Sequence, residues 1–150
     1  MMLSAKQRQA IYDHCLREYP NEAVGVVIGP EGSHTQDRII PCINALEKLC
    51  ARDPEQHPCG TEAGFAMDPE RLLLIDAECR AKGWRMKLIY HSHPDGDTQF
   101  SSADRAGALA HDGTPLHPHV EHMVLAIEKR AVTGHAFYRW DEERRDLVAV

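Results

Sequence analysis

The segment from Trp84 to Asp104 constrains the fold more than any other part of the chain, because it specifies a strand, a loop and a helix in direct succession. Residues 84–93 carry apolar side chains at alternate positions, which predicts a central strand. A polar loop follows from Pro94 to Phe100. The serine after it can cap a helix that we predict over about Ser102 to His111, with a glycine shortly past its end.

His91, His93 and Asp104 are candidate metal ligands at this junction. The two histidines close the predicted strand, and side chains two apart on a strand point to the same face. Asp104 lies in the first turn of the next helix, which the loop can fold back over the strand end. Two imidazoles and a carboxylate suit zinc, whereas magnesium and calcium prefer mainly oxygen ligands. Three protein ligands leave a fourth position open, which is typical of a catalytic zinc site.

The other predicted elements complete an α/β pattern. Helices are predicted from Ser4 to about Glu18 and from Asp68 to Gly83, and strands at Ala23–Ile28, near Arg38–Ile43, near His122–Glu128, near Gly134–Trp140 and at Asp146–Val150. Prolines and a glycine interrupt residues 44–64, which we predict to be a long loop with a short helical piece around residues 45–50. This order predicts a mixed central sheet flanked by helices.

Length and composition indicate one globular domain over residues 1–150. The formal net charge is −6 and no dense block of Lys or Arg occurs, which argues against nucleic-acid binding. No stretch reaches the roughly 18 apolar residues that a membrane span needs. Residues 1–8 lack the apolar core of a signal peptide. Five scattered cysteines fit free thiols in a reducing cytoplasm better than a disulfide framework.

Simpler roles exist for each candidate residue. A helix N-cap alone would explain Ser101-x-x-Asp104, and an isolated His-x-His is more often incidental than ligating. Their conjunction at a strand–loop–helix junction favours a metal. A hydrolase also needs a carboxylate that moves the protons of water. Asp95 and Asp97 lie in a loop that we expect to be solvated. Glu22, just before the first apolar strand, is the better candidate, although an exposed junction residue would also account for it.

Three segments together resemble the JAMM (MPN+) zinc metalloproteases. They are Glu22 followed by Ala-Val-Gly-Val-Val-Ile-Gly, then His91-Ser92-His93-Pro94, and Ser101-x-x-Asp104. Asn44 after the second strand and Phe65-x-x-Asp68-Pro69 before the second helix also look like that family. The order of predicted elements suits its fold, a mixed sheet with helices related to that of the cytidine deaminases.

The resemblance implies a role for each of these residues. His91, His93 and Asp104 would bind one zinc ion. Glu22 would hold and deprotonate the zinc-bound water and return the proton to the leaving amine. Ser101 would donate a hydrogen bond to the oxyanion of the tetrahedral intermediate. The chain would then be a metallopeptidase or isopeptidase.

The resemblance also implies a class of substrate. JAMM enzymes cleave after the C-terminal glycine of ubiquitin or a ubiquitin-like protein, whose extended tail could add to a sheet edge. Residues 44–64 would correspond to the insertion that shapes the tail groove. The short segment from Asp112 to Val120 lacks the large second insertion of linkage-specific members. This compact form is similar to the prokaryotic branch, which acts on ubiquitin-like modifiers, including those of antiphage operons, or on sulfur-carrier proteins with a Gly-Gly tail.

Several alternatives remain open from the sequence. A zinc-dependent deaminase would need His-x-Glu and Pro-Cys-x-x-Cys, and neither Pro41-Cys42 nor Pro58-Cys59 completes that pattern. A non-enzymatic scaffold of the same fold would usually have lost ligands that are present here. Two further clusters could bind a second metal, but loop residues without metal are favoured for both; they are Cys50, His57 and Cys59, and His111, His117, His119 and His122. The sequence leaves the particular substrate and the oligomeric state open.

Overall fold

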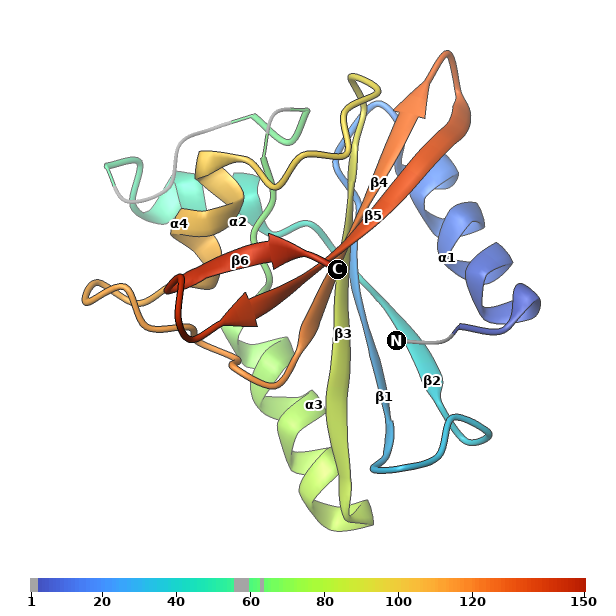
Figure 1. Ribbon diagram of the computed structural model, residues 1–150. Helices are drawn as coiled ribbons and strands as arrows, with labels where there is room; N and C mark the ends of the chain where they lie inside the picture. Colours follow the sequence, from blue (N-terminus) through green and yellow to red (C-terminus); the bar gives the residue numbers. More distant parts are fainter. Residues whose placement is uncertain (1–2, 56–59, 63) are drawn as a thin grey trace.

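The computed structural model describes residues 3–55, 60–62 and 64–150. Within these ranges the chain forms four helices and six strands (Figure 1). The helices are α1 (Ala5–Glu18), α2 (Leu46–Arg52), α3 (Pro69–Lys82) and α4 (Ser102–Ala108), and the strands are β1 (Val24–Pro30), β2 (Arg38–Cys42), β3 (Trp84–His93), β4 (Glu121–Glu128), β5 (Ala131–Asp141) and β6 (Asp146–Ala149). The predicted α/β class is confirmed.

The strands form one mixed sheet in the order β2-β1-β3-β4-β5-β6. The pair β3–β4 is parallel, and the other neighbouring strands are antiparallel. Strand β3 lies in the interior of the sheet, with the helix α4 in the crossover to β4. Its residues from Lys87 to His93 are all buried. The segment that carries the motif is therefore held by strands on both sides, as the sequence predicts.

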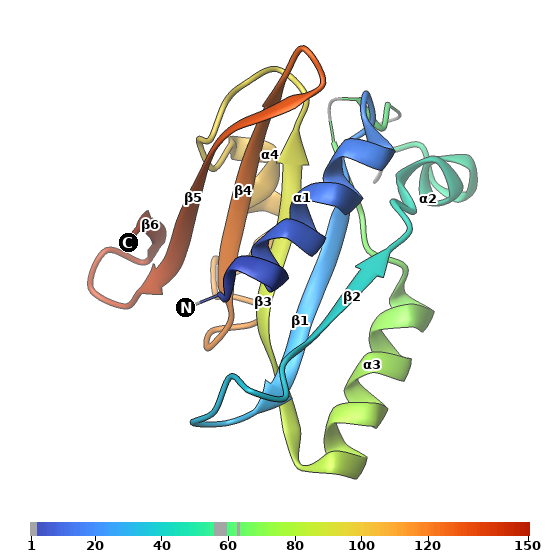
Figure 2. The ribbon, with the colours of Figure 1, turned by 90° about the vertical axis from the view of Figure 1, so that its right-hand side faces the viewer.

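Helices cover both faces of the sheet (Figure 2). On one face, Ile11 and Cys15 of α1 pack in a buried cluster with Leu88 and Tyr90 of β3. On the opposite face, Ile75 of α3 packs in a second cluster with residues of β1, β2 and β3. The predicted mixed sheet flanked by helices is thus confirmed, and α1 and α3 each bury apolar side chains against one face.

Capping residues set the ends of the two long helices. Ser4 caps α1 and forms a capping box with Gln7. Asp68 caps α3, and Pro69 occupies the first turn, where its missing N–H leaves no bond unmade. Gly83 ends α3 with φ at 68°, a left-handed conformation that favours glycine. Both helices were predicted within one or two residues because these caps are readable in the sequence.

Two details differ from the predictions. Helix α4 ends at Ala108 and not near His111, because Leu109 is extended and bridges to Pro115. The expectation of free thiols holds for Cys15, Cys42 and Cys79 but is wrong at Cys50, which is disulfide-bonded. None of the described helices is both long and apolar enough to cross a membrane. A cytoplasmic location stays a prediction.

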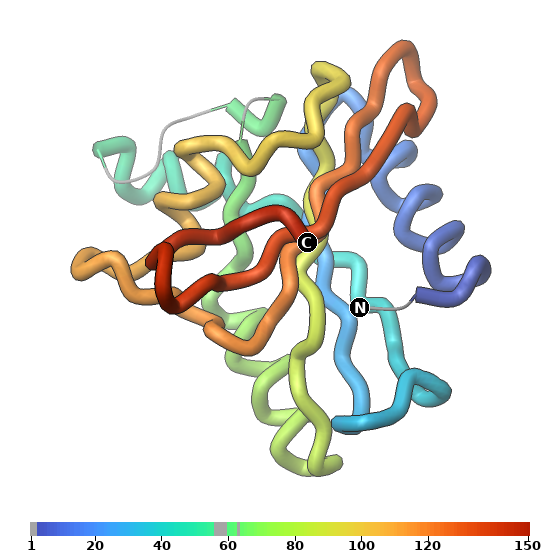
Figure 3. Tube along the Cα trace, viewed as in Figure 1, coloured from blue at the N-terminus to red at the C-terminus, as the bar shows by residue number. Residues whose placement is uncertain are grey.

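The elements that carry the motif residues meet at one end of the sheet. The chain trace in Figure 3 brings the loop after β3 and the segment after α2 to the same end. Val24, at the start of β1, pairs with His91 near the end of β3. Gly25 next to it lies against the Tyr90 ring, where a Cβ would come within 2.2 Å of the phenol. Close packing of these two strands therefore fixes the start of β1 against the end of β3.

Candidate metal centre

Four buried side chains converge at this end of the sheet. They are Glu22, His91, His93 and Asp104, and one ligand atom from each lies within 4.8 Å of all the others. The structure thus brings together the candidate ligands and the candidate carboxylate named from the sequence. Within the described ranges, no other set of three or more His, Cys, Asp or Glu side chains converges in this way.

One oxygen of Asp104 lies between the two histidines. Asp104 Oδ2 is 3.1 Å from His91 Nε2 and 3.1 Å from His93 Nε2, and the two Nε2 atoms are 3.2 Å apart. Two imidazole nitrogens and one carboxylate oxygen around a point form the donor set that a borderline-soft divalent cation prefers. These residues could therefore hold a metal ion.

The orientation of His93 is set from outside the cluster. Its Nδ1 donates a hydrogen bond to the Asp97 carbonyl, with the two atoms 3.0 Å apart. A proton on Nδ1 leaves the Nε2 lone pair directed into the cluster, as a metal ligand requires. Asp97, which the sequence offered as a candidate base, thus contributes through its backbone. Asp95 is exposed.

His91 is held by aromatic rings. The ring of Phe65 stacks on the His91 imidazole with 4.4 Å between centroids, and Phe100 approaches edge-on at 6.1 Å. His91 is fully buried, and its Nδ1 has no hydrogen-bond partner among the described residues. The Phe65 contact gives a physical role to a position that the sequence marked only by resemblance.

Asp104 and Ser101 also form a helix cap. Ser101 Oγ accepts from Asp104 N–H at 3.0 Å, and Asp104 Oδ2 accepts from Ser101 N–H at 3.0 Å. Ser101 and Asp104 therefore do form the helix N-cap that the simpler explanation predicted. The same Asp104 oxygen faces both histidines, so capping fixes the carboxylate in position and does not compete with a ligand role.

Glu22 is buried beside the ligands, with its Oε1 4.0 Å from His93 Nε2. The backbone N–H and the backbone carbonyl of Glu22 are both hydrogen-bonded. Glu22 N–H donates to the Thr61 carbonyl at 2.7 Å, and Asn44 donates from Nδ2 to the Glu22 carbonyl at 2.9 Å. Glu22 Oε1 itself has no partner among the described residues. A buried carboxylate oxygen without a donor is costly, so this position is arranged for something other than stability.

Sequence reasoning missed the contacts that hold Glu22 relative to the histidines. The Ser92 hydroxyl accepts from Ala23 N–H at 2.8 Å, and Ser92 N–H donates to the Ala23 carbonyl at 3.1 Å. Asn44 also accepts from Leu46 N–H and Ala66 N–H. Hydrogen bonds from single Ser or Asn side chains have no periodicity, so only the resemblance pointed to Asn44.

Burial and mutual interactions shift the pKa values of all four side chains in the cluster. Burial raises the pKa of Glu22 to about 7, with the charge of His93 opposing and that of Asp104 adding to the shift. Burial lowers the pKa of His91. Burial alone would raise the pKa of Asp104, but hydrogen bonds from the two histidines hold it well below its usual range. Against the opposing effect of burial, Asp104 raises the pKa of His93 to about 8.

The other candidate clusters are not brought into this site. His117 and His119 line a separate apolar groove against α3. His122 is buried under Phe100, and burial lowers its pKa to about 4. His111 is exposed. The other candidate cluster was Cys50, His57 and Cys59. His57 and Cys59 lie outside the described residues, and the disulfide at Cys50 makes that sulfur unsuitable as a thiolate ligand.

Fold and donor set together define an α/β domain with a buried candidate metal site at one sheet end. The chain belongs to the prokaryotic homologs of the JAB domain, since the model of that family matches residues 4–141.

Two curated relatives are the CysO-cysteine peptidases of Mycobacterium tuberculosis (strain ATCC 25618 / H37Rv) and Mycobacterium bovis. Each is 29% identical to this chain over 112 residues, which cover 69% of this chain and 62% of the relative. The match thus spans less than two thirds of the length of these relatives.

Two solved structures share the fold. A protein from Desulfitobacterium hafniense superposes with a TM-score of 0.67 at 20% identity, covering 98% of this chain and 87% of its own. A protein from Salinibacter ruber superposes with a TM-score of 0.63 at 17% identity, covering 100% and 88%. At these identities the likeness shows the fold alone.

Proposed function

We propose that this chain is a zinc-dependent peptidase that hydrolyses the bond after the C-terminal glycine of a ubiquitin-like or sulfur-carrier protein, with residues 1–150 acting as one domain. One observation carries the proposal: Glu22 Oε1, which has no hydrogen-bond partner among the described residues, lies buried beside three converging ligand atoms. Three ligands with an adjacent base are what a hydrolytic site needs and what a structural site does not.

His91, His93 and Asp104 would hold the zinc ion through Nε2, Nε2 and Oδ2. When bound there, zinc supplies Lewis acidity that polarises a carbonyl and lowers the pKa of a water molecule. Asp104 is fixed by the cap of α4, and His93 by its bond to the Asp97 carbonyl. The ligands are therefore set in place before the metal arrives, which favours affinity.

Glu22 would move the proton. Its buried carboxyl lies beside the three ligands, where it can both accept and return a proton. The proton leaves the attacking water for Glu22 Oε1 and passes from there to the nitrogen of the leaving amine. The backbone bonds of Glu22 to Thr61 and Asn44 keep this oxygen beside the ligands during both transfers.

Ser101 would stabilise the oxyanion. Its Oγ already accepts from Asp104 N–H, and a hydroxyl has one proton to donate besides its acceptor sites. That proton can be directed at the substrate carbonyl oxygen without disturbing the cap. Ser101 is half-buried, and its N–H bonds the Asp104 oxygen that faces the two histidines.

The relatives favour one substrate within this class. Both are CysO-cysteine peptidases, which supports a sulfur-carrier protein with a residue attached after its terminal glycine. Isopeptide deconjugation of a ubiquitin-like modifier, including one of an antiphage operon, uses the same carbonyl chemistry and differs only in the leaving amine.

The test uses ubiquitin-like and sulfur-carrier proteins that end in Gly-Gly, extended either by cysteine or by an isopeptide-linked lysine. Intact-protein mass spectrometry of the products should show cleavage after the second glycine in the zinc-loaded wild type. Glu22→Gln should abolish the product, while Glu31→Gln, at an exposed surface glutamate, should cleave normally. Absence of cleavage by the zinc-loaded protein, or equal cleavage by Glu22→Gln, would overturn the proposal and favour a scaffold of the same fold.

A further inference from the structure

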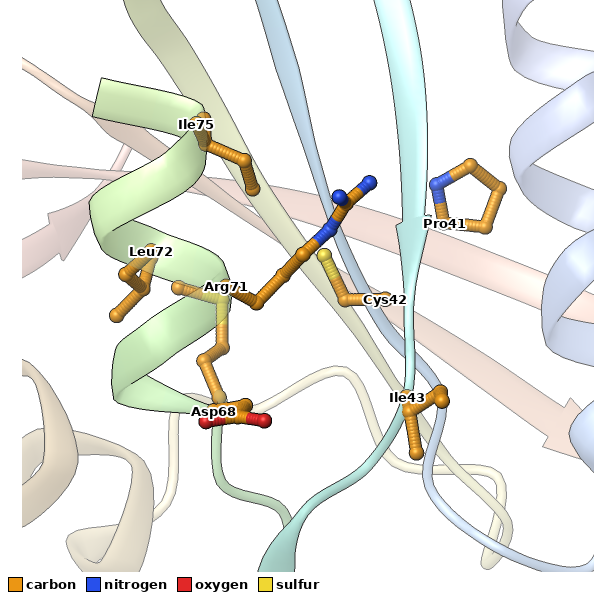
Figure 4. A pocket seen from close by; sticks show the side chains of 8 residues that line it. Pro41, Cys42, Ile43, Asp68, Arg71, Leu72 and Ile75 are labelled. Atoms are coloured by element: carbon orange, nitrogen blue, oxygen red, sulfur yellow. The ribbon is translucent and has the colours of Figure 1, made fainter. Parts of the chain in front are cut away.

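A small cavity lies on the α3 side of the sheet. It holds about 340 Å³ between the end of β2 and the start of α3 (Figure 4). The lining residues are Pro41, Cys42, Ile43, Met67, Asp68, Arg71, Leu72 and Ile75. Most of its wall is apolar, so the few polar groups in it decide what it can bind.

Arg71 supplies the unbalanced charge in this cavity. Figure 4 shows its side chain extending from α3 toward β2, with the guanidinium beside Cys42. Burial raises the pKa of the Cys42 thiol, and the charge of Arg71 acts against that rise. Asp68 contributes a carboxylate, but it already binds Lys48 Nζ at 3.3 Å and caps α3 through Glu70 N–H at 3.1 Å. Arg71 has no carboxylate partner within the described part of the chain.

The cavity and the metal centre share a face and an end of the sheet. Val24 pairs with Cys42 on one side and with His91 on the other. Two strand spacings, or about 10 Å, therefore separate the backbones of Cys42 and His91. The segment from Phe65 to Met67 joins the two places, since Phe65 stacks on His91 and Met67 lines the cavity.

For a tail that crosses the end of the sheet from His91 toward Cys42, this distance suits one position. An extended chain advances about 3.3 Å per residue, so the Cα of the third residue before the scissile bond lies about 8 Å from it, and its side chain extends further. In a tail that ends in Gly-Gly, this third residue is the first with a side chain.

Resting on the proposed function, we propose that the cavity at Arg71 selects substrates with glutamate or aspartate immediately before the terminal Gly-Gly. The apolar wall from Met67 and Ile75 accommodates the methylene stem, and Arg71 pairs with the carboxylate. The planar guanidinium binds a carboxylate with two parallel hydrogen bonds, whereas a lysine at this tail position meets a like charge. A glutamine keeps the shape and loses the charge.

The experiment uses twelve-residue peptides that end in Xaa-Gly-Gly-Cys, with Glu, Gln or Lys at Xaa. Zinc-loaded wild type should cleave the Glu peptide with a kcat/KM about fivefold above the Gln peptide, as a partly exposed ion pair gives. Arg71→Gln should remove this difference, and Arg71→Glu should favour the Lys peptide. Arg80→Gln, at an α3 residue outside the cavity that pairs with Asp76, should keep the wild-type preference.

Binding separates this inference from the proposed function. Affinities of the same peptides for zinc-loaded Glu22→Gln report the preference without any cleavage. A Glu preference that follows Arg71 supports the cavity even where no peptide is cleaved, in which case the proposed function fails alone. Equal kcat/KM and equal affinity for the three peptides, or a Glu preference that survives Arg71→Gln, overturns the inference while leaving the hydrolysis intact.

Discussion

Strand β3 contributes to two buried charged clusters, one near Lys87 and one at His91 and His93, and the two clusters are built differently. Near its start, Lys87 Nζ lies 2.6 Å from Asp37 Oδ1 and 2.5 Å from the Ser33 carbonyl. The second Asp37 oxygen is 2.9 Å from His34 Nδ1. At the other end, Glu22 and Asp104 meet two histidines, and no described lysine or arginine forms an ion pair with either carboxylate.

The contrast shows which cluster serves stability. The Lys87 cluster supplies its own cation, so its buried carboxylate is compensated by the fold. The Glu22 cluster has two carboxylates and only titratable imidazoles, and Glu22 Oε1 has no hydrogen-bond partner in the described part of the chain. This difference between the two clusters supports our proposal that the second one takes a cation from outside.

Glu22→Gln is the substitution from which we expect the largest effect, and the effect should fall on catalysis and not on stability. We expect kcat to fall about 10³-fold, because the group that accepts and returns the proton is lost. Zinc content and thermal unfolding temperature should stay close to wild type, since Glu22 is not one of the three proposed ligands. Steady-state kinetics with matched metal analysis measure both, and a variant that loses its zinc would show that Glu22 is a ligand.

Lys87→Met tests the other cluster. Removal of the cation leaves Asp37 buried and uncompensated, so we expect a loss of about 3 kcal/mol in the free energy of unfolding. The zinc stoichiometry and the kcat of the remaining folded protein should not change. Urea unfolding followed by fluorescence gives the free energy. An equal fall in kcat would mean that the two clusters are coupled and that the contrast between them is false.

Ser101→Ala sharpens the role of the capping serine. Loss of an oxyanion donor should lower kcat about 10²-fold, and loss of the cap should cost about 1 kcal/mol of stability. Ser101→Thr keeps both the hydroxyl and the cap and should restore most of each. Ser102→Ala, at the next and exposed position, is the control. A loss of stability without a loss of kcat would leave Ser101 with the cap alone.

The sequence predicted the ligands because their pattern is local. His91 and His93 share a strand face, and Asp104 lies one short loop away on a helix whose cap is also readable. The sheet order could not be derived from this pattern, because pairing between β1 and β3 depends on close contacts such as Gly25 against Tyr90. The position of Glu22 depends on that pairing, so only family resemblance linked it to the histidines. The Lys87–Asp37 pair had no sequence signal at all.

The stability of the metal-free protein, measured over a series of pH values, tests the raised pKa of Glu22. The folded-state pKa of about 7 lies above the ordinary glutamate pKa of 4.5, so the folded protein holds this proton more tightly than the unfolded chain does. The resulting stability is complete below pH 4.5 and is lost as the pH rises through 7. Relative to Glu22→Gln, the metal-free wild type should lose about 2 kcal/mol between pH 5 and pH 8. Parallel unfolding curves for the two proteins over this range would contradict the shift.

We expect the cluster at the end of β3 to hold a cation that the fold does not supply. Elemental analysis of protein purified without chelator measures this directly. We expect about one zinc per chain in the wild type and in Lys87→Met, and none in a variant with both His91→Ala and Asp104→Ala. Wild-type protein that carries no metal and takes up none from a zinc solution would contradict it.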